Sequence, residues 1–154
     1  MAGKEETGEK LVATNRKARH EYSILDSYET GIVLTGTEVK SLRQGSANLA
    51  EGYAMIKDGE LWLFGMHISP YAHGSYSNVD PLRRRKLLVH KKELRKMAAR
   101  VKDKGLTLVP LKVYFAHGLA KLQLGVCRGK KEYDKRQDIA RRDAERAIRR
   151  HIAR

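Results

Sequence analysis

Residues 53–65 read YAMIKDGELWLFG, and this stretch decides the fold class. Two short runs rich in apolar residues, Tyr53 to Lys57 and Glu60 to Gly65, flank Asp58 and Gly59. An Asp-Gly dipeptide readily adopts the positive φ angles that a two-residue hairpin turn requires. The stretch therefore predicts a pair of antiparallel strands.

A second hairpin is predicted nearer the C-terminus, where Leu106 to Phe115 and Leu119 to Cys127 flank Ala116-His117-Gly118. Other strand-like runs are Tyr22 to Tyr28, Gly31 to Thr35 and Lys86 to Val89, with a turn expected near Thr30 and Gly31. Short strands joined by hairpins indicate a mainly β protein rather than a parallel sheet. We expect a closed β-barrel like the oligonucleotide-binding (OB) fold, with short flanking helices.

Two short helices and one long loop are expected beside the strands. The first helix covers Thr37 to Leu42, with Thr37 as its cap. The second follows from apolar residues at helical spacing over 92–101, and Gly105 is expected to end it. Residues 68–81 contain two prolines and no regular period, which is typical of a loop.

Basic residues strongly outnumber acidic ones. The 154 residues include 32 Lys and Arg against 18 Asp and Glu, which gives a formal net charge of +14. A chain of this length favours one globular core with appended tails. So large a positive surplus calls for a polyanionic partner, and nucleic acid is the leading inference.

The distribution of apolar residues divides the chain into three parts. Residues 1–14 show no periodic apolar pattern and are expected to be disordered. Residues 15–130 hold nearly all the large apolar side chains and form the expected barrel. Residues 131–154 are rich in arginine and too poor in apolar residues to bury themselves, so this tail is expected to be disordered when free.

The tail nevertheless carries helix signals. Asp134 can cap a helix, and Asp138 with Arg142 and Glu145 with Arg149 are favourable i,i+4 pairs. A helix with so thin an apolar stripe is marginal in water. We expect it to form when a polyanionic groove neutralises its arginines; the alternative is a helix docked permanently on the barrel.

Several function classes are disfavoured by what the sequence lacks. Cys127 is the only cysteine, so neither an internal disulfide nor a multi-thiolate metal site is expected. The histidines show no metal-ligand spacing, and no nucleophile elbow or nucleotide-binding loop is present. No membrane-span or signal-peptide pattern stands out, so a cytoplasmic protein that is not an enzyme, without cofactor, metal, membrane or small-molecule substrate, is expected.

A dense basic cluster begins with Arg83, Arg84, Arg85 and Lys86 and continues with Lys91, Lys92, Arg95 and Lys96. Cations that pair with phosphates release condensed counterions, which gives strong, salt-sensitive affinity with little sequence preference. The alternatives are a solvated helix face and a targeting signal. Phosphate binding is favoured by the charge of the whole chain.

Residues 15–22 read NRKARHEY and precede the first strand. Arg16, Lys17 and Arg19 lie beside His20 and Tyr22, and such side chains can stack on unpaired bases as well as contact phosphates. The alternative is a basic lead-in to the barrel. For Tyr22 alone, packing into the barrel is the better interpretation.

Several stretches together resemble the bacterial SsrA-binding protein (small protein B) family. They are NRKARHEY at 15–22, YETGIVLTGTEVKSLRQGSANL at 28–49, DGELWLFGMHISPY at 58–71, DPLRRRKLLVHKKEL at 80–94, KGLTLVPLKVYF at 104–115 and GKKEYDKRQDIARRD at 129–143. The resemblance implies an OB barrel that binds the tRNA-like domain of transfer-messenger RNA. It also implies a role in trans-translation, which rescues stalled ribosomes.

The resemblance also implies site residues. Asn15, Glu29, Leu88 and Lys121 are expected on or beneath the RNA surface, with cations such as Lys17, Arg19 and Lys40. Because a carboxylate repels phosphate, Glu29 would accept hydrogen bonds from base amino groups or orient a cation; a structural salt bridge is the alternative. Leu88 is expected to pack. Gly129, Lys130 and Lys131 are further candidates at the junction of barrel and tail.

For the tail, the resemblance implies a helix in the empty mRNA channel of the stalled 70S ribosome. Tyr133, Asp134, Lys135 and Arg136 would then lie at the decoding centre, with Tyr133 placed to stack on a ribosomal base. Many relatives have histidine at this position, so a proton that titrates near neutral pH cannot be required here. Two rival classes remain: a structural ribosomal or assembly protein, and a small nuclease that would lack any convincing catalytic set.

Overall fold

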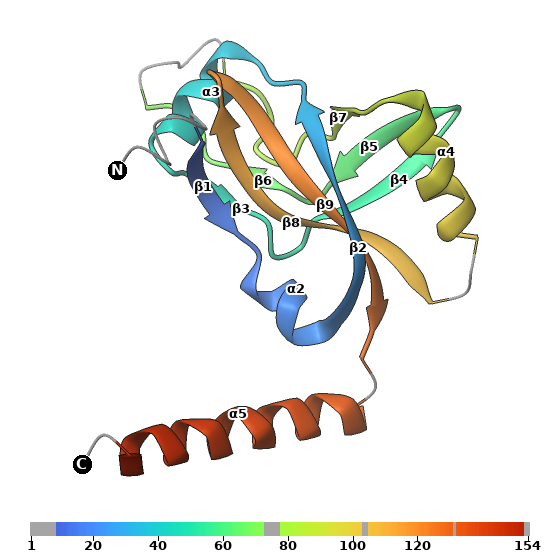
Figure 1. Cartoon of the computed structure of the whole chain (residues 1–154). Coiled ribbons are helices and arrows are strands. Elements are labelled where there is room, and N and C mark those ends of the chain that lie inside the picture. The colour runs from blue at the N-terminus through green and yellow to red at the C-terminus, as the bar shows by residue number, and fades with distance from the viewer. Residues whose placement is uncertain (1–8, 73–77, 103–104, 131, 153–154) are drawn as a thin grey trace.

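The computed structural model describes residues 9–72, 78–102, 105–130 and 132–152 and is mostly β with short helices (Figure 1). The strands are β1 (Lys10–Thr14), β2 (Tyr22–Ile32), β3 (Ala47–Asn48), β4 (Tyr53–Lys57), β5 (Glu60–Phe64), β6 (His67–Ile68), β7 (Arg85–Leu88), β8 (Leu106–Ala116) and β9 (Leu119–Gly129). The helices are α2 (Arg16–Glu21), α3 (Gly36–Arg43), α4 (Lys91–Arg100) and α5 (Glu132–Ile152).

The main strands pair antiparallel in an order that returns on itself. The sequence of neighbours is β8, β4, β5, β7, β2, β9 and then β8 again. β1 lies along β8 beyond the point where β4 leaves it, and β3 pairs with β6 separately. The ring of pairings gives the strands a shared inner side. Part of the outer side of β8 and β9 is covered by α2, where Val109, Leu111 and Cys127 pack with Ala18 in a second buried cluster.

Both predicted hairpins are confirmed. Asp58 and Gly59 have φ angles of 51° and 74°, and His117 and Gly118 have 52° and 77°. These are the paired positive φ values that a tight two-residue turn requires. Because each hairpin is set by its own turn, the local sequence was sufficient to predict it.

The inner side of the ring is a continuous apolar core. Leu61 and Leu63 of β5 and Leu122 and Leu124 of β9 alternate with outward residues and are at most 1% exposed. Met97 of α4 joins this core and is completely buried. Period-two burial of this kind places every second residue of a strand on the outer side.

Several predicted boundaries were wrong. No turn interrupts β2 near Thr30 and Gly31, because Thr30 is buried and its hydroxyl donates to the Leu122 carbonyl oxygen at 2.9 Å. Helix α3 is capped by Thr35 rather than Thr37, through a capping box that Thr35 forms with Glu38. Pairing with β9 carries β2 through the position of the expected turn. The capping box starts α3 before Thr37.

The N-terminal prediction needs correction as well. Residues 1–8 lie outside the described residues, but 10–14, which were expected to be disordered, form β1. This strand pairs with 112–115 of β8. Its order comes from a partner about a hundred positions away, which the composition of the segment could not reveal.

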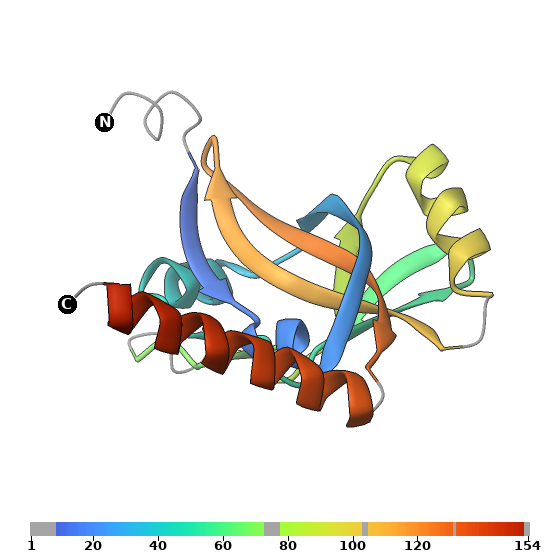
Figure 2. The same cartoon turned by 60° about the horizontal axis from the view of Figure 1, so that its bottom comes forward.

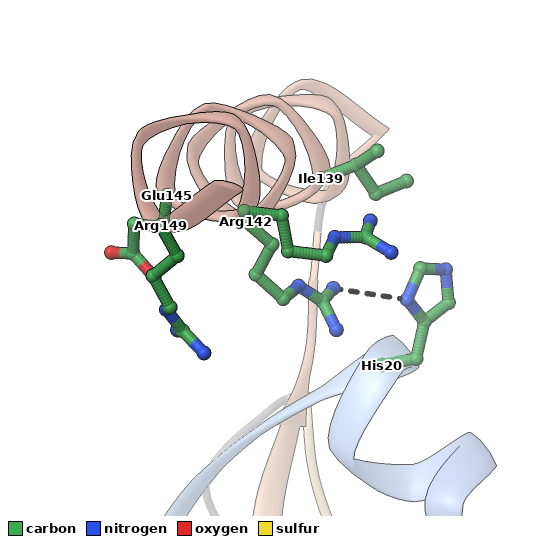
Figure 3. A pocket seen from close by; sticks show the side chains of 6 residues that line it. His20, Ile139, Arg142, Glu145 and Arg149 are labelled. Carbon is green, nitrogen blue, oxygen red and sulfur yellow. Dashed lines mark hydrogen bonds and ion pairs between the residues drawn. The ribbon is translucent and has the colours of Figure 1, made fainter. Parts of the chain in front are cut away.

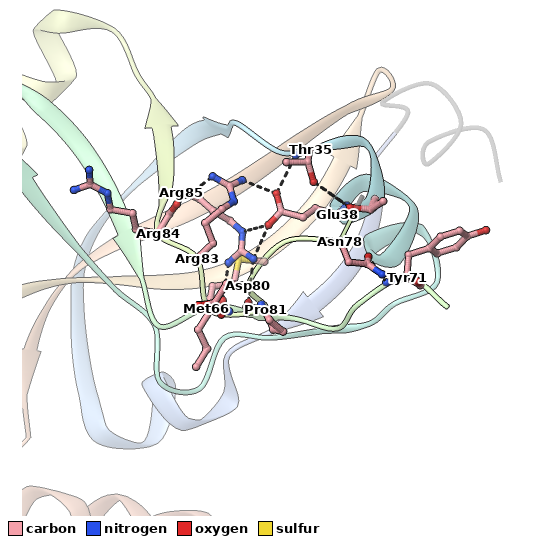
Figure 4. A network of polar contacts seen from close by, with 12 residues as sticks. Thr35, Glu38, Met66, Tyr71, Asn78, Asp80, Pro81, Arg83, Arg84 and Arg85 are labelled. Carbon is pink, nitrogen blue, oxygen red and sulfur yellow. Dashed lines mark hydrogen bonds and ion pairs between the residues drawn. The ribbon is translucent and has the colours of Figure 1, made fainter. Parts of the chain in front are cut away.

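A buried ion pair joins α3 to the start of β7 (Figure 4). Arg85 is 1% exposed and Glu38 is 4% exposed. The Arg85 Nε donates to Glu38 Oε2 at 2.7 Å, and its two terminal nitrogens donate to the carbonyl oxygens of Met66 at 2.7 Å and Pro81 at 3.0 Å. Glu38 Oε1 also accepts from Arg83 at 2.5 Å and from the Thr35 backbone at 2.9 Å.

These contacts set the ionisation of Glu38. Burial alone would raise its pKa, but the hydrogen bonds from Arg83 and the Thr35 backbone, together with the Arg85 charge, hold the pKa below its usual value. The pair is therefore ionised at neutral pH. Glu38 contributes stability above the ordinary carboxyl pKa, and this contribution disappears as the pH falls through the lower pKa of the folded state.

We predict that Glu38→Gln lowers the free energy of unfolding at pH 7 by about 3 kcal/mol, because it leaves the buried Arg85 charge uncompensated. Glu60→Gln, which breaks the exposed pair of Glu60 with Lys86, should cost less than about 1 kcal/mol. Urea unfolding of both variants measures the difference. The deficit of Glu38→Gln should shrink as the pH falls from the ordinary carboxyl pKa towards the lower pKa of folded Glu38, because the unfolded chain takes up the proton first; a deficit independent of pH would contradict the assignment.

Candidate nucleic-acid interface

Asn15 is buried and caps the N-terminal end of helix α2. Its Oδ1 accepts from the Ala18 backbone at 3.0 Å, and its Nδ2 donates to the carbonyl oxygens of Leu49 at 3.1 Å and Pro110 at 2.8 Å. The residue is only 2% exposed. Its side-chain polar atoms are therefore used inside the protein, and its effect on any ligand passes through α2.

The basic segment at 15–22, for which no helix was predicted, contains helix α2. It exposes Arg16, Lys17 and Arg19, while His20 is half-buried. Lys17 Nζ lies 2.7 Å from Glu51 Oε1, and the hydrogen bond and charge of Glu51 raise the pKa of Lys17. Asn15 caps the helix and so fixes where the helix begins, which sets the direction in which the cations of α2 point.

Three residues far apart in the sequence meet in one hollow. Glu29 of β2, Leu88 of β7 and Lys121 of β9 line an open cavity of about 490 Å³. Gly31 pairs in register with both Leu88 and Lys121, and a Cβ at Gly31 would lie 3.4 Å from Leu88 Cβ. Because Gly31 has no side chain, the floor of the cavity between Leu88 and Lys121 stays open.

Glu29 is oriented by a residue that the sequence did not single out. The Tyr114 hydroxyl donates a hydrogen bond to Glu29 Oε2. Burial, and then the hydrogen bond to Glu29, raises the pKa of Tyr114, so the hydroxyl keeps its proton at neutral pH. Tyr114 lies opposite Lys121 in the register of β8 with β9. The alternation of these two strands was therefore a signal by which Tyr114 could have been found.

The N-terminal end of α4 completes the hollow. His90 and Glu93 line it, although neither was predicted as a site residue. Leu88 is 52% exposed, so it does not pack into the core as expected. The hollow therefore combines a lysine, oriented or adjacent carboxylates, an imidazole and one exposed apolar side chain, which suits hydrogen bonding and stacking more than simple phosphate binding.

The basic cluster is split by strand alternation. Arg85 points into the protein and is buried, whereas Arg84 is exposed and Lys86 is half-buried at the surface. Arg84 lies over the Trp62 ring, 4.4 Å from its centroid, and Lys86 forms an ion pair with Glu60. The prediction that Arg85 contacts a nucleic acid directly is therefore wrong.

Other predicted cations lie elsewhere on the surface. Lys40 of α3 is exposed and its Nζ lies 5.5 Å from the Tyr71 ring centroid. The exposed cations of α4 are Lys91, Lys92, Arg95 and Lys96. The structure thus brings together one part of the candidate set around the hollow, one part on α2, and leaves Lys40 on a separate helix.

The structure describes the end of β9 and the first residue of the junction to the tail, Lys130. Gly129 ends β9, and the Lys130 backbone N–H donates to the Glu21 carbonyl oxygen at 2.9 Å. Lys131 lies outside the described residues, as do the side chains of Tyr133, Asp134, Lys135 and Arg136. The predictions for these five residues therefore stay predictions.

Helix α5 runs beside the body on the side of α2 (Figure 2). All described side chains of α5, at 139–149, are exposed. Arg142 Nη2 donates to His20 Nδ1 at 3.3 Å across an open cavity of about 460 Å³ (Figure 3). The described part of this helix makes a polar contact with the body without burying an apolar face.

Two features are absent from the described residues. No helix among them is both long and apolar enough to cross a membrane. Within the same residues, no group of His, Cys, Asp and Glu side chains is arranged to hold a metal ion. Burial raises the pKa of the Cys127 thiol to about 11, so this cysteine is protonated at neutral pH.

Comparisons with known proteins agree with one another. The family described as SmpB protein matches residues 12–154. The SsrA-binding protein of Desulfitobacterium hafniense is 56% identical over 145 residues, which cover 94% of this chain and 93% of that protein. The SsrA-binding protein of Mycolicibacterium smegmatis is 55% identical over 145 residues, covering 94% and 90%.

A solved structure is similar as well. It is described as "tmRNA-SmpB: a journey to the center of the bacterial ribosome", and it matches with a TM-score of 0.68 and 57% identity over 79% of this chain and 85% of that chain. The sequence match extends across the candidate interface and the tail. On these grounds the chain belongs to the SmpB family.

Proposed function

We propose that this chain binds transfer-messenger RNA through the tRNA-like domain of that RNA and delivers it to stalled ribosomes in trans-translation. The observation that carries the proposal is the meeting in one hollow of Glu29, Leu88 and Lys121, three residues that the resemblance implies for the RNA surface. Membership of the SmpB family supports it, and so do the names of the relatives. The role is that of a binding protein rather than an enzyme.

The RNA surface extends from the hollow to helix α2. Lys121 contacts phosphate or a base edge, while Glu29, held by Tyr114, accepts hydrogen bonds from base amino groups. Arg16, Lys17 and Arg19 contribute cations, and Asn15 acts by positioning them. This division of roles follows from exposure: the α2 cations reach solvent, whereas Asn15 does not.

The body serves as a closed barrel of the OB kind. The pairing of β8 with β9, which closes the order β8, β4, β5, β7, β2, β9 on itself, supports this assignment. An OB barrel presents an outer strand face to a nucleic acid. In this chain β2, which borders both β7 and β9, lies at the centre of that face.

The tail has a separate role. It is disordered in the free protein and folds in the empty mRNA channel, with Tyr133, Asp134, Lys135 and Arg136 at the decoding centre. The exposure of all described α5 side chains supports a helix that depends on a polyanionic surrounding. A structural ribosomal protein would instead reside stably on vacant subunits, and copurification of RNA from a lysate separates the two classes.

We predict that Lys121→Glu weakens binding to the isolated tRNA-like domain by about 5- to 50-fold at fixed salt, because it removes a cation and adds a repulsive charge in the hollow. Lys102→Glu makes the same charge change at an exposed site next to α4 and should alter the affinity less than about twofold. Filter binding or anisotropy measures both. Equal losses in the two variants would remove Lys121 from a specific site.

We predict that deletion of 134–154 leaves affinity for the tRNA-like domain within about threefold of wild type but abolishes peptide tagging on stalled ribosomes. The deletion removes most of α5 and leaves the ring, α2 and the hollow complete. Anisotropy and a reconstituted tagging reaction provide the two readouts. A parallel loss of both activities would contradict separate roles for barrel and tail.

A further inference from the structure

The outer side of β4 and β5 carries aromatic residues where solvent-facing strands usually carry polar ones. Register places Tyr53 opposite Phe64, and Met55 opposite Trp62. Tyr53 is 45% exposed and Met55 is 44% exposed. We call the surface formed by Tyr53, Phe64, Met55 and Trp62 the aromatic face; the core residues of the same strands, such as Leu61 and Leu63, point the other way.

The rings of the aromatic face are arranged as stacking surfaces. The Tyr53 and Phe64 rings are stacked, with centroids 5.4 Å apart and planes 17° apart. The Arg84 guanidinium carbon lies 4.4 Å from the centroid of the Trp62 ring. Since Arg84 is itself exposed, the guanidinium presents a second flat surface towards solvent.

Cations are interleaved with the rings. Lys57 Nζ lies 5.5 Å from the Phe64 centroid, and Lys86 pairs in register with Trp62. Glu60 opposes Lys57 and forms an ion pair with Lys86, so it offsets part of this charge. Aromatic rings that offer π-faces between positive charges suit a chain of unpaired bases linked by phosphates.

We propose that the aromatic face binds unpaired bases of RNA as a site separate from the hollow of the proposed function. A base stacks on the Arg84 guanidinium above Trp62, a second base stacks near Tyr53, and Lys57 and Lys86 pair with the linking phosphates. Every base has a π-face, so this site accepts single strands with little sequence preference.

Two features favour RNA over a protein partner. A protein that covered the face would have to desolvate Arg84 and Lys57, whereas the phosphates of RNA neutralise both. The face is also continuous with the hollow along β7, where Lys86 faces outward and Leu88, two residues later, lines the hollow. A single-stranded segment next to a folded RNA can therefore reach the aromatic face.

Fluorescence tests the proposal directly, because Trp62 is the only tryptophan of the chain. Full-length protein is titrated with a short oligouridine, and polyphosphate provides a matched anion without bases. We expect oligouridine to quench Trp62 at saturation and polyphosphate to leave the emission nearly unchanged. Quenching by both ligands to the same extent, or by neither, would overturn base stacking; the latter outcome would favour a protein partner.

Variants locate the binding and separate this site from the hollow. Tyr53→Leu keeps apolar bulk and Arg84→Lys keeps the charge, but each removes a flat stacking surface, so each should weaken oligouridine binding by about five- to tenfold. Lys121→Glu should leave oligouridine binding intact, and Tyr53→Leu should leave affinity for the tRNA-like domain intact. Retention of oligouridine affinity in both aromatic-face variants would refute the site even if the proposed function holds.

Discussion

The buried ion pair between Glu38 and Arg85 is the constraint on which the candidate binding surfaces depend. A guanidinium in a protein interior is tolerated only when its donors are paired, and Arg85 meets that condition through Glu38 and two backbone carbonyl oxygens. Once Arg85 is fixed inward, strand alternation forces Arg84 and Lys86 outward and brings Leu88 to the hollow. A single inward charge thus sets what β7 offers on its outer side.

Interior polar groups play the same part elsewhere in the molecule. Asn15 contacts two distant backbone carbonyl oxygens from inside and thereby directs the cations of α2. Tyr114 donates to Glu29 and so holds a carboxylate at the rim of the hollow. The candidate residues therefore form two groups: residues that can touch a ligand, and residues that position the first group. The exposure of a side chain separates the two groups better than its residue type does.

The sequence predicted what depends on neighbouring residues and missed what depends on distant ones. The hairpins were predictable because Asp58-Gly59 and His117-Gly118 set their own turns. Helix α2 and strand β1 were missed because their partners, at 49 and 110–115, are far along the chain. Burial of Arg85 was missed because a run of four cations reads as surface, although the alternation of β7 carried the signal that one of them points inward.

The tail shows why a helix in the structure is compatible with disorder in solution. Ile139 and Ile148 are 42% and 58% exposed, so the described part of α5 gains little from apolar burial. The remaining stabilisation comes from pairs such as Glu145 with Arg149, at 4.0 Å, which contribute only about 0.2–0.5 kcal/mol each. Exposed arginines that repel one another along the helix are stabilised when phosphates surround them. Under the proposed function, the same arginines that weaken α5 in water would strengthen it in an RNA-lined channel, so folding of the tail would be coupled to its binding there.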